Sequence, residues 1–475
     1  MEKQNESGVQ EDLTYETVLV FEENKRKHLP VPADGTDFWM AVAYAVVGYS
    51  FVYVFSSDHF AWKFSVFTAV YAAAVLAYLT LKKRKVPKES WFWLAMMLGS
   101  GIPYGFYTAM PVFQVPGTAA LAAYWTLSAG GCLIEDGRTS QWAAADFWNS
   151  IWKVPFGNFA CFFHVLSGGG EEMTEDQNAL SGEVQEKKKD VETAEAGKKN
   201  LRKAGVRKLG AILFGVILAV PVLLIVLPLL SSADDNFNRL IVSFLDSLSE
   251  NVLSFVLRAV CSIPVTAYLF GLIYGCIYRR KTDGIRRESV QAAGEGARII
   301  SDAAVNTALL ILSACYVLFI VLQAQYLFSA FVGVRPDTYT YSEYARKGFF
   351  ELCAVAAVNL AVLLLANLFT KTKREQNRGL RILNLVIAVL TLLLIATAMS
   401  KMVLYISAYG LTIKRITTMT FMSWMAVVFL LWCAGQRQKL PLIRAAWMSG
   451  TGLYVLLCVL PLEQIVSVFN RLFYG

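Results

Sequence analysis

The sequence has little charge and few of the residues on which catalytic and metal sites depend. Only 17% of its 475 residues are charged, against about a quarter in soluble domains, and it holds three histidines. It contains no P-loop, no HExxH motif and no GxSxG motif. Its eight cysteines stand singly, without a CxxC pair, which argues against a zinc site or a disulfide framework. We therefore predict no catalytic, cofactor-binding or metal-binding residue.

Residues 1–37 also lack the marks of a targeting segment. They carry nine acidic side chains, and no apolar core follows the first methionine, so we expect no secretory signal. Nor is the segment rich in arginine and poor in acids, as a transit peptide would be. We predict a polar cytoplasmic tail.

Long apolar runs, in contrast, are abundant. The chain is 56% hydrophobic, and segments of about 20 apolar residues, the length that crosses a bilayer, recur along it. The fold class predicted from this pattern is all-α, a polytopic transmembrane helical bundle. We expect eleven spans, at 38–55, 61–81, 91–112, 116–134, 209–230, 252–277, 303–331, 349–369, 382–404, 416–434 and 446–461.

The distribution of Lys and Arg predicts the orientation of these spans. With a cytoplasmic N-terminus, 34 of the 44 basic residues fall in inside segments and 8 in outside segments. Without the long loop 135–208 the split is still 23 to 8. Because cytoplasmic loops carry the excess of basic residues, we predict that the N-terminus is inside and the C-terminus outside. The basic residues lie in short runs between spans, so a nucleic-acid partner is not expected.

The predicted spans and loops define four segments. Residues 1–37 form the cytoplasmic tail, 38–134 a four-span bundle, 135–208 a cytoplasmic loop and 209–475 a seven-span bundle. The aromatic stretch 142–166, broken at Pro155–Gly157, predicts two short helices that lie at the membrane interface or bind a partner.

The rest of the loop is first acidic and then basic. The acidic half is typical of a solvated linker. The basic half should attract anionic lipid, at about 1 kcal/mol per residue near the surface. Its juxtamembrane basic residues are Lys187, Lys188, Lys189, Lys198, Lys199, Arg202, Lys203, Arg207 and Lys208.

Residues 338–367 place ionisable groups next to hydrocarbon. Thr340 and Glu343 fit a capping box, in which Glu343 is structural. Glu351 follows at the apolar boundary, where a carboxylate must pair, protonate or face water. Asn359 and Asn367 further along predict hydrogen bonds between helices or part of an ion path.

A polar cluster is predicted at the outward ends of several spans. Arg258 lies inside its span and needs a partner, and Lys401 is a candidate to meet Glu351. Structural salt bridges and a gated polar pathway both explain such a cluster. Its predicted members are Arg258, Glu343, Arg346, Glu351, Lys401, Asp234 and Asp235. Near Lys401, Tyr405 and Tyr409 fit an interfacial belt, and Gly410 suits a helix C-terminus.

Four motifs resemble landmarks of a known family. They are SADDNF within 231–237, YSEYARKGFFEL at 341–352, NLAVLLLA at 359–366, and LYISAYGLT with Arg415 at 404–415. The chain resembles, over about 205–435, the bacterial polytopic membrane family called domain of unknown function 4173, which is related to family 4153. The resemblance implies an integral protein of the bacterial cytoplasmic membrane and supplies neither a substrate nor a catalytic residue.

Two functions are consistent with these observations. The first is a transporter-like or permease-like protein with an outward-facing polar cluster. The alternative is a non-transporting membrane regulator or assembly partner that binds a protein through the loop 135–208. A membrane enzyme ranks third, since no motif nominates one. Anionic lipid at the basic cytoplasmic loops is the expected lipid partner.

Overall fold

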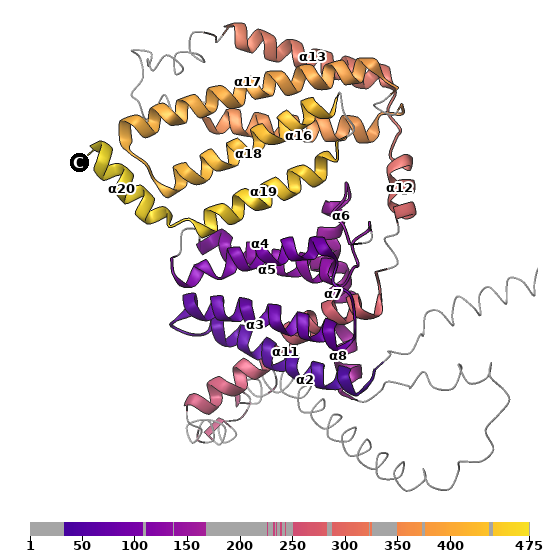
Figure 1. The fold of residues 1–475 in the computed structure, drawn as a ribbon, viewed down its shortest axis with the longest axis vertical. Coiled ribbons are helices and arrows are strands. Elements are labelled where there is room, and N and C mark those ends of the chain that lie inside the picture. The colour runs from indigo at the N-terminus through magenta and orange to yellow at the C-terminus, as the bar shows by residue number, and fades with distance from the viewer. Residues whose placement is uncertain are drawn as a thin grey trace, which may run out of the picture. The chain divides into compact units, whose positions relative to one another are not determined.

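The structure, a computed structural model, is all-α over the residues it describes (Figure 1). These are residues 33–107, 111–135, 137–167, 250–282, 287–322, 349–372, 376–436 and 440–474, with isolated positions between 226 and 243 and at 324. Of the two isolated β-bridges in this part of the chain, Ile300 with Thr370 joins residues next to two helix ends, and Glu135 with Arg138 lies within a loop. The predicted fold class is therefore confirmed as helical.

Eight of the described helices are long and apolar enough to cross a membrane. They match eight of the eleven predicted spans, which supports a multi-pass membrane protein. Their bounds are α2 Gly35–Phe55, α3 Phe60–Leu81, α11 Glu250–Tyr278, α13 Asp302–Leu322, α16 Phe349–Phe369, α17 Arg378–Tyr409, α18 Ile413–Gly435 and α19 Leu442–Val459.

The other three predicted spans are not among these eight helices, each for a separate reason. Helix α4, Lys88–Gly101, has only 14 residues and gives way to a 3-10 turn at Pro103, so it is short for a full crossing. Helix α5, Pro111–Ala129, is helical as predicted but is not among the eight. The span predicted at 209–230 lies outside the described residues except at position 226.

The chain divides into two compact units. Unit 1 comprises Met1–Tyr53 and Pro155–Tyr274, and its described helices are α2, α8 (Phe159–Leu166) and most of α11. Its core is aromatic, with the ring of Phe270 6.0 Å from that of Tyr44 and 5.7 Å from that of Phe162. Gly48 of α2 lies against Thr266 of α11, where an added Cβ would clash with the threonine hydroxyl. The missing side chain lets the two backbones approach closely.

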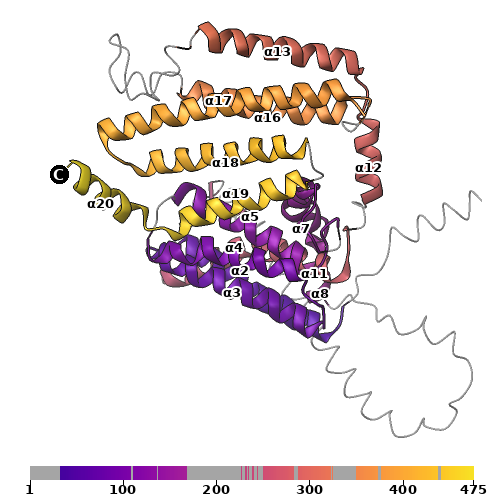
Figure 2. The ribbon, with the colours of Figure 1, turned by 45° about the horizontal axis from the view of Figure 1, so that its top comes forward.

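Unit 2 comprises Val54–Val154 and Gly275–Gly475. Within it α13, α16, α17, α18 and α19 run side by side, and α19 also packs on α4, which packs on α5 (Figures 1 and 2). Asn377 caps α17 by accepting from the Leu380 amide at 2.9 Å, and Gly410, at φ 76°, ends it. The helix end predicted at Gly410 is thus confirmed.

Asparagines join the helices of unit 2 at buried positions. Asn359 of α16 is fully buried, accepts from the Tyr316 hydroxyl at 2.5 Å and donates to the Thr391 hydroxyl at 2.8 Å. Asn384 of α17 donates to Asn367 at 3.1 Å. Of the two roles left open for Asn359 and Asn367, hydrogen bonding between helices is the one observed.

The aromatic stretch 142–166 is helical, as predicted, but its break falls elsewhere. Helix α6 (Ala143–Trp148), a π-helical turn (Asn149–Lys153) and α7 (Val154–Gly157) precede α8, and the interruption is at Asn158 rather than at Pro155. Pro155 follows directly on the π-helical turn, an irregularity at which a helix accommodates a residue without an amide hydrogen. Trp148, Trp152 and Phe156 are exposed, so an aromatic face remains for a membrane interface or a partner.

Helix α20, Leu462–Tyr474, was not predicted. Asn470 of α20 accepts from the Leu411 amide at 2.7 Å and donates to the Leu411 carbonyl at 3.0 Å. These two bonds fasten α20 to the turn between α17 and α18.

Candidate functional site

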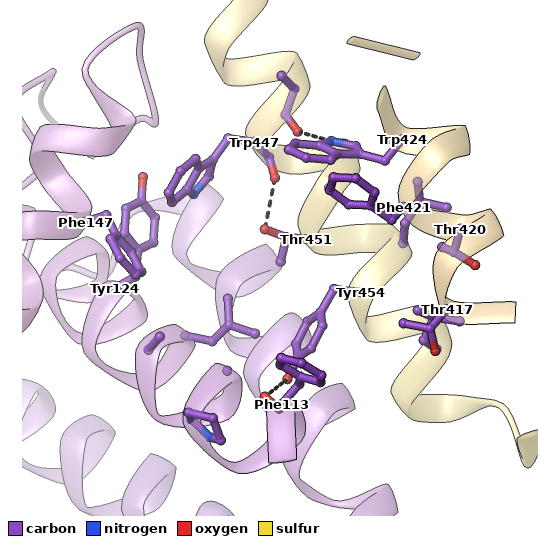
Figure 3. A pocket seen from close by; sticks show the side chains of 18 of the residues that line it. Phe113, Tyr124, Phe147, Thr417, Thr420, Phe421, Trp424, Trp447, Thr451 and Tyr454 are labelled. Carbon is purple, nitrogen blue, oxygen red and sulfur yellow. Dashed lines mark hydrogen bonds between the residues drawn. The ribbon is translucent and has the colours of Figure 1, made fainter. Parts of the chain in front are cut away.

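A groove of about 790 Å³ opens on unit 2 between α5, α18 and α19 (Figure 3). Each of the three helices contributes residues at i, i+3, i+4 and i+7, the spacing of one helix face. On α18 these are Thr417, Thr420, Phe421 and Trp424. On α19 they are Trp447, Gly450, Thr451 and Tyr454, and on α5 the lining runs from Phe113 to Tyr124.

Aromatic rings line much of the groove. The Trp447 ring lies 6.2 Å from that of Tyr124 and 5.4 Å, edge to face, from that of Phe147 on α6. Trp424 is held in place because its indole N–H donates to the Ala446 carbonyl at 3.0 Å. Fixed rings give the groove a defined apolar surface.

The hydroxyl groups around the groove already donate to backbone carbonyls. Thr417 and Thr420 donate to the carbonyls four residues earlier at 2.9 Å, and Thr451 donates to the Trp447 carbonyl at 2.9 Å. The Tyr454 hydroxyl donates to the Gln114 carbonyl at 3.2 Å. Because these donors are engaged, the groove favours an apolar occupant.

A second, cationic pocket of about 470 Å³ adjoins the groove and shares Thr418 with it. It is lined by the ends of α16, α17 and α18, including Tyr405, Lys414 and Arg415. The Arg415 guanidinium stacks 4.1 Å from the Tyr405 ring and donates to the carbonyls of Tyr409, at 3.0 Å, and Gly410. Lys414 is exposed.

A polar network lies at the other end of the groove. Glu89 accepts from Arg444 of α19 at 2.7 Å and from the Thr139 amide at 2.9 Å. The Thr139 hydroxyl in turn bonds the indole N–H of Trp93 and the hydroxyl of Tyr124, each at 3.1 Å. The network ties α4, α5 and α19 to the start of the loop that follows α5.

Asp146 of α6 lies next to Phe147, the loop residue that lines the groove. It is fully buried and accepts from the Ile134 amide at 3.0 Å. Its other carboxyl oxygen has no hydrogen-bond partner among the described residues. The pKa of Asp146 is raised to about 7, mainly by burial and in smaller part by the Glu135 charge, while the hydrogen bond from the Ile134 amide opposes the shift. This carboxyl therefore changes charge near neutral pH.

The described members of the predicted polar cluster lie in different places. In unit 1, Arg258 of α11 is half-buried with its guanidinium 5.3 Å from the Tyr53 ring, and Asp234 is exposed. In unit 2, Lys401 is fully buried in α17, and Glu351 is exposed in the first turn of α16. Neither residue lines the groove, and the pairing of Glu351 with Lys401 stays a prediction.

The remaining predicted site residues lie outside the described residues. They are Asp235, Glu343 and Arg346 of the cluster, and the juxtamembrane Lys187, Lys188, Lys189, Lys198, Lys199, Arg202, Lys203, Arg207 and Lys208. The cluster as a whole stays a prediction.

The groove itself was missed by sequence reasoning. The signal that could have found it is the helical stripe of small, hydroxyl and aromatic residues that recurs in 113–124, 417–424 and 447–454. Neither Lys414 nor Arg415 was assigned to a pocket from the sequence. In the described residues no group of three or more His, Cys, Asp or Glu side chains could hold a metal ion.

The fold and site define a multi-pass helical membrane protein with an apolar groove between α5, α18 and α19. The chain belongs to the family Domain of unknown function (DUF4153), whose model matches residues 41–471. This is the relative of the family that the motifs resembled, and the match also takes in the N-terminal spans. No curated protein matches the chain, and neither does any solved structure.

Proposed function

We propose that the protein is transporter-like and moves an amphipathic molecule that enters the groove of unit 2 from the bilayer. The observation that carries the proposal is the groove itself, apolar in its lining and open between α5, α18 and α19. Two of these helices are candidate spans. In this proposal the groove opens toward the hydrocarbon. Its volume of about 790 Å³ falls within the usual range of ligand sites.

The length of the groove fits one leaflet. Its lining runs from Ala446 to Leu457 on α19 and from Phe113 to Tyr124 on α5. Eleven residues at 1.5 Å each span about 16 Å, roughly half of the 30 Å hydrocarbon thickness. A single acyl chain in one leaflet would occupy such a length.

A bacterial cytoplasmic membrane, eleven spans and a cytoplasmic N-terminus complete the proposal. The family resemblance supports the location. The eight observed candidate spans support the count in part, and the excess of Lys and Arg in alternate loops supports the orientation. The finer family 4173 remains an interpretation of the four motifs.

The regulatory alternative has one supporting observation. Phe147, which belongs to the loop 135–208, packs against Trp447 and lines the groove, so a partner bound to the loop would be sensed there. Deletion of 171–197 tests this role. Loss of co-purifying proteins with normal membrane insertion supports it, and unchanged partners contradict it.

Transport is tested with vesicles that contain the purified full-length chain and a fluorescent phosphatidylcholine quenched by dithionite from outside. Ala120 lines the groove, whereas the neighbouring Ala119 is exposed and does not. We expect wild-type protein to move the lipid between leaflets, Ala120→Phe to block this movement, and Ala119→Phe to leave it unchanged.

Two results would contradict the proposal. Rates in wild-type vesicles no higher than in protein-free vesicles would rule out transport of this lipid. Equal rates for Ala120→Phe and Ala119→Phe would show that the lipid does not pass through the groove.

A further inference from the structure

The apolar groove and the cationic pocket meet at Thr418. Thr418 lines both, and its hydroxyl donates to the Lys414 carbonyl at 2.6 Å. The groove continues from there along α18 to Trp424, toward the middle of the helix. The cationic pocket lies at the start of α18, where a spanning helix emerges from the hydrocarbon. An apolar site at membrane depth thus ends in a charged site at the interface.

The charges at this end of unit 2 favour an anion. Lys414 and Arg415 line the pocket. Among its described lining residues these two are cationic and none is acidic. Arg and Lys are the side chains that proteins use to bind phosphate.

The pocket is also built to hold its shape. Arg415 is fixed by the Tyr405 ring and by the carbonyls of Tyr409 and Gly410. The adjacent Leu411 backbone is fastened on both sides by Asn470 of α20. The Lys414 side chain is exposed. In the described contacts its ammonium does not bind a backbone carbonyl as the Arg415 guanidinium does, so it can move. A fixed and a movable cation together suit a head group at the membrane surface.

We propose that the groove and the cationic pocket form one binding site for an anionic phospholipid, with an acyl chain along α18 and α19 and the phosphate at Lys414 and Arg415. The inference rests on the proposed function, since it names the class of molecule that the groove accepts. A soluble anion would use the pocket alone. The apolar groove that begins at Thr418 has no role for such an anion but matches an acyl chain. The charge distribution assigns this end to the outer leaflet.

The site is tested by labelling with two photoreactive lipids that differ only in head group. Full-length protein is reconstituted with phosphatidylglycerol or phosphatidylcholine that carries a diazirine on one acyl chain, and labelled peptides are mapped by mass spectrometry. We expect both lipids to label α18 and α19, and phosphatidylglycerol to label them about fivefold or more above phosphatidylcholine, since each interfacial cation is worth about a factor of five.

The variants separate the head-group site from the groove. Lys414→Gln should lower labelling by phosphatidylglycerol about fivefold and leave phosphatidylcholine unchanged. Arg415→Gln should act in the same direction, but Arg415 also holds the end of α17, so Lys414→Gln is the decisive variant. Lys63→Gln, at the start of α3 and outside both linings, is the matched control and should change neither lipid.

Each outcome has one meaning. Equal labelling by the two lipids, or no effect of Lys414→Gln, overturns the anionic-lipid site while leaving the groove intact. Labelling of both lipids that Ala120→Phe does not reduce overturns the groove itself. Loss of the phosphatidylglycerol preference in millimolar inorganic phosphate would identify a soluble anion as the occupant of the cationic pocket and overturn the lipid assignment.

Discussion

The carboxylate of Glu89 lies 2.7 Å from a guanidinium nitrogen of Arg444, a residue 355 positions further along the chain. Glu89 is in the first turn of α4 and Arg444 is near the start of α19. The Glu89 side chain is 9% exposed and that of Arg444 34%. This ion pair fastens the N-terminal helices of unit 2 to the helix that forms the floor of the groove.

Removing Glu89 should loosen that junction. Glu89→Gln leaves Arg444 without its acidic partner and weakens the acceptor for the Thr139 amide. We therefore expect the free energy of unfolding to fall by about 1–3 kcal/mol. This value lies between the limits for exposed and buried pairs. Arg444→Met should lower the free energy of unfolding less in the Glu89→Gln variant than in the wild type. Thermal unfolding in detergent gives the double-mutant cycle, and strict additivity would contradict a coupled pair.

Asp146 should make stability depend on pH. Its pKa is near 7 when folded and near 3.8 when unfolded. Between those values the unfolded chain loses a proton that the folded chain keeps, so stability falls as pH rises from about 4 to 7 and is then constant. At 1.36 kcal/mol per unit, the loss is on the order of 4 kcal/mol.

Asp146→Asn keeps an acceptor for the Ile134 amide and removes the titration. The variant should therefore gain melting temperature relative to wild type as pH rises from 5 to 7, and the gain should stay level at pH 8. Asp58→Asn, at an exposed carboxyl, is the control and should show no such trend. A gain from Asp146→Asn that is the same at pH 5 and pH 8 would contradict the assignment.

The sequence predicted a helix correctly where residues within or next to that helix determine its ends. The run 349–369 is apolar apart from Glu351, Asn359 and Asn367, and α16 occupies those residues. Gly410 ends α17 as predicted, whereas the helix begins at Arg378 behind an Asn377 cap, before the predicted start of the span at 382. The shortness of α4 did not follow, because a single Pro103 after Ser100-Gly101 ends a helix whose apolar run goes on. Helix α20 was missed because its placement depends on Asn470 reaching a distant turn.

The site followed much less well, for a different reason. Lys414 and Arg415 look like interfacial anchors in any sequence, and only their place beside Thr418 gives them a pocket. The groove needs one helix face from each of α5, α18 and α19, separated by about 300 residues of chain. No local sequence pattern predicts which helix faces pack against one another. Glu351 stood out because a carboxylate next to hydrocarbon is unusual in itself.

Asn359 should stabilise the packing of α13, α16 and α17. Asn359→Ala leaves the hydroxyls of Tyr316 and Thr391 without their buried partner, and we expect a loss of about 1–2 kcal/mol. Val358→Ala, at the exposed neighbour on the same helix, should be close to neutral. Thermal unfolding in one detergent measures both. An equal effect of the two substitutions would show that the hydrogen bonds contribute nothing.

For Glu351 and Lys401 we predict the sign of the change in stability that each substitution causes. An ammonium as buried as that of Lys401 is costly, and Glu351 offsets part of the cost from the first turn of α16. Lys401→Met removes both the cost and the attraction, so it should be neutral or stabilising. Glu351→Gln should destabilise the wild type and have no effect once residue 401 is Met.

The coupling between the two substitutions should be about 0.5–1 kcal/mol, at the low end for interacting residues because Glu351 is exposed. Thermal unfolding of the wild type, both single variants and the double variant measures it. If Glu351→Gln lowers stability equally in both backgrounds, Glu351 acts on another group. If Lys401→Met destabilises strongly, the ammonium makes contacts that outweigh its burial. Agreement with the predicted signs would make this pair a structural element of unit 2, separate from the groove that we propose carries the function.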